Sequence, residues 1–123
     1  MSELYFLTAE QVCEIQAITL PGVPCSDTGK VHGTVVRVLN AYYYENVTDT
    51  FELAAMYLIA IARGHAFPDA NKRTAFQAAA TFLDMNGLEL RNSDELVRVT
   101  VLAASGGIDR IELSEYLKAL SKG

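Results

Sequence analysis

The chain has 123 residues, of which half are hydrophobic and a fifth are charged. This length and composition fit one soluble domain over residues 1–123 and exclude a disordered chain. The formal net charge of −5 argues against a general nucleic-acid binder, which needs a basic face, so we expect no direct DNA binding.

The sequence also bears on where the protein works. It shows no signal peptide and no apolar run of membrane-spanning length. Its two cysteines, Cys13 and Cys25, form no CxxC pair and have no histidine at metal-ligand spacing. We therefore expect two reduced thiols in a cytoplasmic protein with no membrane contact.

Helical periodicity dominates the first half of the chain. Thr8 with Gln11 predicts a capping box for a helix reaching about residue 20. The prolines and glycines of residues 21–32 predict an irregular loop, followed by a helix over residues 33–44. Thr48 or Asp49 is expected to cap a third helix, which ends near Arg63. This helix is apolar around much of its circumference, so we expect it to be central in the fold.

The second half continues in the same manner. A fourth helix is predicted over residues 71–86, and residues 88–90 are expected to be briefly extended. Ser93 is expected to cap a fifth helix, and Ser114 a final one. The fifth helix should bury Leu96, Val99, Thr100 and Ala103, and the sixth should carry Tyr116, Leu117 and Leu120. The predicted fold is a compact all-α bundle of about six helices.

The most informative stretch is residues 65–73, HAFPDANKR, between the third and fourth helices. Asn71, Lys72 and Arg73 would occupy the first turn of a helix, whose free N–H groups and dipole make that end positive. Two cations there are unfavourable unless an anion is bound, and a broken local rule of this kind often marks a functional site. The alternative is that both cations point to solvent or pair with Asp69 and Asp84.

His65 and Asp69 complete this constellation. An imidazole of near-neutral pKa can act as a general base for a hydroxyl, although a lone histidine is often only hydrogen-bonded to backbone. Asp69 follows Pro68, so it can cap the helix, bind Mg²⁺ together with phosphate oxygens, or do both. Asn71 can likewise cap the helix or donate its amide to a phosphate oxygen.

Arg63 lies two residues before His65. It can be a cation that complements the C-terminal end of its own helix, or a further phosphate contact. These residues together predict a site that transfers a phosphate-containing group.

Residues 65–73 resemble the signature of the Fic/Doc superfamily, which reads His-x-Phe-x-Asp/Glu-Gly/Ala-Asn-Gly/Lys-Arg. Residues 48–52, 62–65 and 86–87, and the short length, resemble the Doc (death-on-curing) branch in particular. That branch comprises toxins of type II toxin–antitoxin pairs. The resemblance implies a Fic-type helical fold over almost the whole chain.

The resemblance also implies a chemistry. Fic enzymes usually transfer AMP from ATP to a protein hydroxyl, with a glycine where this chain has Lys72. In Doc this replacement accompanies a reversed nucleotide and protein kinase activity toward a threonine of elongation factor Tu, which halts translation. By this resemblance His65 is the base, Asp69 holds Mg²⁺, and Asn71, Lys72 and Arg73, with help from Arg63, hold the phosphates of ATP.

Two departures refine this expectation. Many Fic enzymes carry another arginine three residues after the motif arginine, where this chain has Phe76. This departure agrees with the Doc branch and weakens the alternative of AMP transfer. The chain also lacks an internal inhibitory Ser/Thr-x-x-x-Glu-Gly/Asn helix, so regulation is expected from a Phd-like antitoxin that binds as a helix in a surface groove. The alternatives are a Fic-type AMP transferase and a catalytically silent module that binds a partner.

Overall fold

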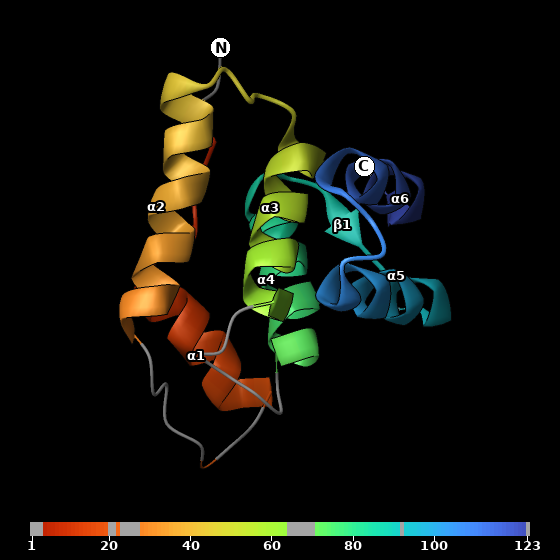
Figure 1. The fold of residues 1–123 in the computed structure, drawn as a ribbon, viewed down its shortest axis with the longest axis horizontal. Coiled ribbons are helices and arrows are strands. Elements are labelled where there is room, and N and C mark those ends of the chain that lie inside the picture. The colour runs from red at the N-terminus through yellow and green to blue at the C-terminus, as the bar shows by residue number, and fades with distance from the viewer. Residues whose placement is uncertain (1–3, 20–21, 23–27, 64–70, 92, 123) are drawn as a thin grey trace.

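The computed structural model describes residues 4–19, 22, 28–63, 71–91 and 93–122, which form six helices and two short strands (Figure 1). This confirms the predicted all-α fold. In chain order the elements are α1 (Ala9–Thr19), α2 (Thr28–Tyr44), α3 (Thr50–Arg63), α4 (Asn71–Met85), β1 (Glu89–Leu90), α5 (Asp94–Ser105), α6 (Arg110–Leu120) and β2 (Ser121–Lys122).

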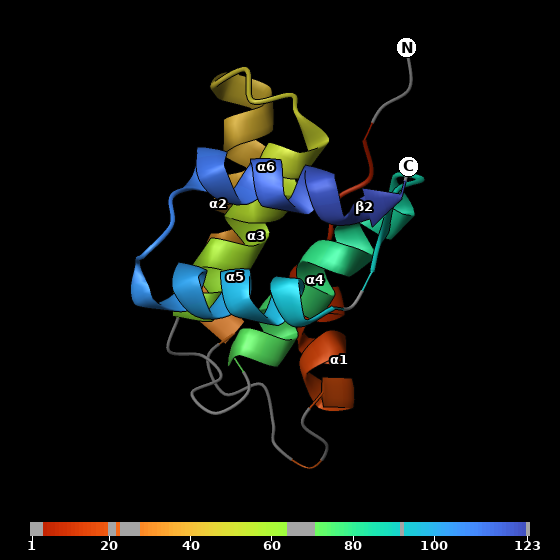
Figure 2. The same cartoon turned by 90° about the vertical axis from the view of Figure 1, so that its right-hand side faces the viewer.

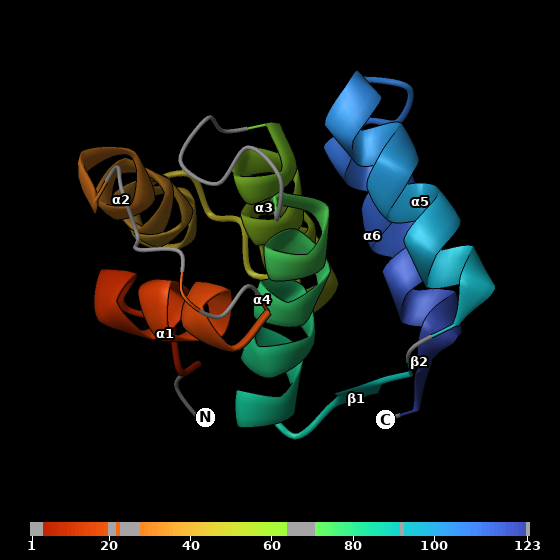
Figure 3. The same cartoon turned by 90° about the horizontal axis from the view of Figure 1, so that it is seen from below.

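The helices form three layers. Helices α3 and α4 lie in the middle, with α1 and α2 on one side and α5 and α6 on the other (Figure 3). Helix α3 contacts α2, α4, α5 and α6, as its apolar circumference predicts. Figure 2 shows α5 and α6 running side by side across the outside of this central pair.

Alanines make up much of the buried surface of the two central helices. Six are buried in α3 and α4, and their small side chains let the two backbones approach closely. The close contact fixes the helix ends that flank residues 64–70. The buried alanines are Ala54, Ala55, Ala62, Ala75, Ala78 and Ala79.

Three of the predicted helix starts are confirmed by their capping hydrogen bonds. Thr8 N–H donates to Gln11 Oε1 at 2.8 Å, and Gln11 N–H donates to Thr8 Oγ1 at 3.1 Å, which is a complete capping box. Asp49 Oδ1 accepts from Phe51 N–H at 2.8 Å, so Asp49 rather than Thr48 caps α3. Ser93 Oγ accepts from Leu96 N–H at 3.1 Å at the start of α5.

The predicted start of α2 is wrong by five residues, because the helix begins at Thr28 and not at Gly33. Val31 is buried and extends the apolar stripe that Val35 and Val38 continue. Gly33 lies on the exposed side of the helix, where the cost of a glycine of about 1 kcal/mol is outweighed by this burial.

The predicted start of α6 is also wrong. Asp109 is the N-cap, and its side chain accepts from Glu112 N–H at 2.8 Å. Ser114 lies inside the helix, where its hydroxyl donates to Ile111 O at 2.7 Å. Aspartate and serine both favour N-caps, so a capping residue type alone does not fix where the helix begins. The buried Leu113 shows that the apolar face begins before Ser114.

Two strands of two residues each pair the segment after α4 with the end of the chain after α6. The predicted extension near residue 89 is confirmed as β1, which pairs antiparallel with β2, a strand that the sequence pattern did not indicate. Ser121 Oγ strengthens the pair by donating to Glu89 O at 2.9 Å.

Two further expectations concern the cysteines and the membrane. Cys13, on α1, is disulfide-bonded, so the prediction of two reduced thiols is wrong. Across the described ranges, no helix combines the length and the apolar character needed to cross a bilayer.

Candidate functional site

The first turn of α4 carries the predicted cations. Helix α4 begins at Asn71, and the side chains of Lys72 and Arg73 are exposed. This turn holds no acidic residue. Asp84 lies near the other end of α4, about 17 Å along the axis at 1.5 Å per residue, and the described side chains show no ion pair between it and either cation. Pairing with Asp84 is therefore excluded for this arrangement.

Side-chain charge and the helix dipole both make the first turn of α4 positive. The unpaired N–H groups of the first turn, the positive end of the helix dipole and two solvent-exposed cations all favour an anion. Arg73 can present its planar guanidinium to two phosphate oxygens, whereas Lys72 acts as a point charge.

The start of α4 is also fastened to the end of α1. Thr74, fully buried, shares a 3.1 Å hydrogen bond between its hydroxyl and that of Thr19. Arg73 Nη1 donates to Thr19 O at 3.4 Å, which is a long contact. Sequence reasoning missed Thr74 and Thr19. A threonine directly after two cations in a helix's first turn was the available signal.

Arg63 lies at the other flank of the motif, as the last residue of α3. Its Nε–H donates to Ala103 O at 2.7 Å, and its Nη2–H donates to Ile108 O at 3.3 Å. Arg63 therefore binds the turn between α5 and α6.

The remaining predicted residues are not placed. His65 and Asp69 lie outside the described residues, as does the side chain of Asn71, so their roles stay predictions. Within the described ranges no cluster of three His, Cys, Asp or Glu side chains could hold a metal ion. Mg²⁺ bound through one carboxylate and phosphate oxygens needs no such cluster.

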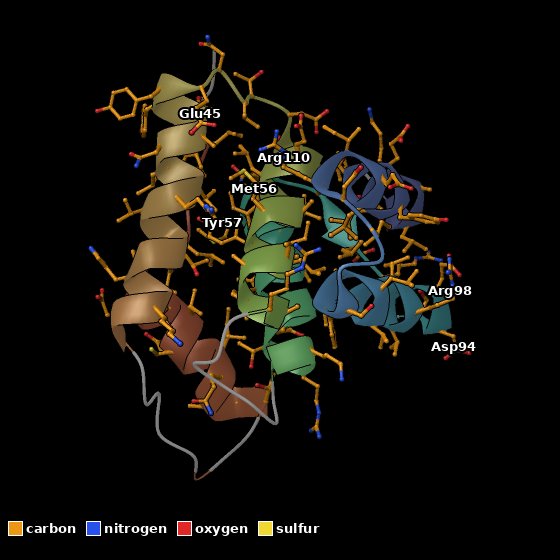
Figure 4. All side chains as sticks on the ribbon, viewed as in Figure 1. Glu45, Met56, Tyr57, Asp94, Arg98 and Arg110 are labelled. Carbon is orange, nitrogen blue, oxygen red and sulfur yellow. The ribbon has the colours of Figure 1, made fainter. Side chains whose placement is uncertain are left out.

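A groove runs along the gap between α2 and α3, and we call it the α2–α3 groove. It consists of two adjoining hollows of about 360 Å³ each, which share Arg37, Ile59 and Ala60. Figure 4 shows Glu45, Met56 and Arg110 at one end of it, between the two helices. Its other end is lined by Lys30, Gly33, Thr34 and Arg63.

The floor and the rim of this groove differ in character. Met56, Ile59 and Ala60 supply apolar surface. Four cations line it against one acid, Glu45, although the whole chain is acidic. The four are Lys30, Arg37, Arg63 and Arg110.

Comparison with known proteins agrees with this arrangement. The family model described as "Fic/DOC family" matches residues 6–83, a span that contains α1 to α3, the motif and most of α4. "Protein kinase doc" from Escherichia phage P1 is 46% identical over 101 residues, which cover 82% of this chain and 79% of that protein. "Toxin Doc" from Mycolicibacterium smegmatis is 36% identical over 87 residues, 69% of this chain and 67% of that protein. This chain thus belongs to the Fic/DOC family, in its Doc branch.

Proposed function

We propose that the protein is a toxin of a type II toxin–antitoxin pair and an ATP-dependent protein kinase. The observation that carries this proposal is the first turn of α4, where Lys72 and Arg73 stand exposed at a positive helix end without an acid. The 46% identity to a protein named as a kinase favours phosphoryl transfer over AMP transfer. The proposed target is a threonine of elongation factor Tu, so that translation halts; such a target would place the toxin in the cytoplasm.

The proposed chemistry assigns one task to each residue. The imidazole of His65 takes the proton of the target hydroxyl as that oxygen attacks the γ-phosphorus of ATP. Asn71, Lys72 and Arg73 bind the phosphate oxygens and offset the charge on the transferred group. Asp69 is the carboxylate that would hold Mg²⁺, which supplies further positive charge to the phosphates. ADP leaves, and the phosphoryl group stays on the hydroxyl.

ATP labelled separately at the α- and γ-phosphates tests this assignment. We expect label on elongation factor Tu from the γ position alone. Label from the α position alone would establish AMP transfer instead, and label from neither would leave a module that only binds a partner.

Lys72→Gly tests why the kinase reaction is favoured. Because Lys72 supplies a cation at the phosphates, its removal is expected to lower γ-label transfer about tenfold or more, and the space gained permits some α-label transfer. Arg91→Gly, at an exposed position after β1, is the matched control and should change neither. Unchanged γ-label transfer by Lys72→Gly would contradict the role of this lysine.

The antitoxin is proposed to bind in the α2–α3 groove as an amphipathic helix. A helix can lay its apolar face on Met56, Ile59 and Ala60 while acidic side chains on its flanks meet the cations of the rim. Arg37 is the central one, because Arg110 is ion-paired with Glu52 at 3.2 Å and Arg63 donates to the turn between α5 and α6. Arg63 belongs to this groove and ends α3, immediately before the motif. An occupant would therefore lie beside the segment that carries the proposed base.

Arg37→Glu tests the groove, because Arg37 lines both of its hollows. The probe is a 20-residue amphipathic peptide with leucines on one face and glutamates on both flanks. We expect Arg37→Glu to weaken its binding about tenfold or more, with a smaller effect at high salt, while Arg91→Glu leaves the affinity unchanged. Equal binding of a peptide with lysines in place of the glutamates would contradict the proposed partner chemistry.

A further inference from the structure

Arg63 binds an element that is distant in sequence from the motif. Ala103, whose carbonyl accepts from Arg63 Nε–H, lies 40 residues away at the end of α5. Ile108, whose carbonyl accepts from Nη2–H, lies 45 residues away, just before α6. One guanidinium therefore joins the end of α3 to both sides of the α5–α6 turn.

The acceptors are well suited to a cation and are held in place. Ala103 O belongs to the C-terminal end of α5, where the helix dipole is negative. Ala103 and Ile108 are buried, so their backbone is anchored in the core. Gly106 caps α5 in the left-handed region at φ 83°, and its N–H also donates to Ala103 O at 3.3 Å.

The two flanks of the motif are thus held in similar ways. Arg63 fastens the end of α3 to the α5–α6 turn, and Thr74 fastens the start of α4 to Thr19 of α1. Phosphoryl transfer depends mainly on positioning and electrostatics, and small displacements of the reacting groups are costly.

We infer that Arg63 is a positioning residue, which fixes the end of α3 and thereby the base that follows two residues later. This inference rests on the proposed function. It replaces the expectation of a phosphate contact by Arg63, because Nε and Nη2 are engaged by backbone carbonyls of the α5–α6 turn. A lysine cannot reproduce this pair of bonds in the same geometry, since its donors lie on one nitrogen and not on two separate nitrogens of a planar guanidinium.

Arg63→Lys and Arg63→Gln distinguish positioning from phosphate binding. If Arg63 positions the base, both variants lower kcat about tenfold or more, and KM for ATP changes less than twofold. If Arg63 binds phosphate, KM for ATP rises strongly in Arg63→Gln and much less in Arg63→Lys, which would overturn the inference. Arg91→Gln is the matched loss of an exposed arginine and should leave both parameters unchanged.

A second variant moves the acceptors and leaves Arg63 in place. Gly106→Val is strained at φ 83° and should displace the α5–α6 turn. If the contact acts as a unit, Gly106→Val lowers kcat as Arg63→Gln does, and the double variant is no worse than either single one. Additive losses would overturn the inference.

Hydrogen exchange gives a readout that needs no activity. We expect Arg63→Gln to speed amide exchange at the last turn of α3, while α1 and the middle of α4 keep wild-type protection. Unchanged exchange at the end of α3 would overturn the inference. If wild-type protein transfers no label but exchange changes as expected, the proposed function fails while the role of Arg63 in fixing this end of α3 stands.

Discussion

Replacing His65 with alanine is expected to abolish phosphoryl transfer while leaving the fold intact. A positioned general base contributes about 10²–10⁴-fold to rate, so the loss should reach that range in kcat. The fold should survive because the buried core consists of side chains from α1 to α6 and the segments between them, within the described residues. Transfer of γ-label to elongation factor Tu measures the first effect, and thermal unfolding followed by circular dichroism measures the second.

A pH profile separates the base from a structural histidine. The reference pKa of histidine is about 6.5, and the proposed base works only as the neutral imidazole. The kcat/KM of wild-type protein should therefore fall as the pH drops through this region. His65→Gln should show a low rate without that dependence. A His65→Ala protein that still transfers phosphate at the wild-type rate would remove the base assignment.

The fold was largely predictable because its signals are local. Capping side chains next to apolar periodicity gave the starts of α1, α3 and α5, and these were confirmed by hydrogen bonds within three residues in sequence. The errors arose where a single local signal pointed to a start that was too late. At α2 a glycine suggested a loop, and at α6 Ser114 suggested the N-cap that Asp109 provides. Burial of Val31 and Leu113 against other helices decided those cases.

The site was predictable only in part, for a related reason. Lys72 and Arg73 lie in the first turn of α4 as predicted, because a helix start can be recognised from nearby residues. The partners of Arg63 could not be inferred, since they are backbone carbonyls 40 and 45 residues away. Backbone carbonyls carry no residue-type signal, and only the packing of α3 against α5 and α6 brings them within reach.

The second large effect is expected at Tyr57, in the centre of α3. Its side chain is fully buried, its ring lies 5.1 Å from that of Phe82, and its hydroxyl accepts from Leu7 N–H at 3.1 Å. Tyr57→Ala should lower the free energy of unfolding by about 3–5 kcal/mol, because it removes a large core side chain and leaves a cavity. Urea unfolding with linear extrapolation measures this change.

Tyr57→Phe isolates the hydrogen bond, since it keeps the ring and removes the hydroxyl. Leu7 is buried, so its N–H loses its partner without gaining water, and the cost should be about 1–3 kcal/mol. A loss as large as that of Tyr57→Ala would show that the ring contact with Phe82 matters less than the hydroxyl.

Wild-type protein and Tyr57→Phe should also differ in how their stability depends on alkaline pH. Burial raises the pKa of the Tyr57 phenol above its usual value, and the bond from Leu7 only partly opposes this. The phenol therefore stays protonated in the folded protein at pH values where the unfolded chain ionises. This contribution to stability is complete below about pH 10 and is lost as the pH rises toward the folded-state pKa. Wild-type protein should accordingly lose stability more steeply than Tyr57→Phe above pH 10, as urea unfolding at pH 9 and pH 11 would measure; parallel losses would contradict the burial of this phenol.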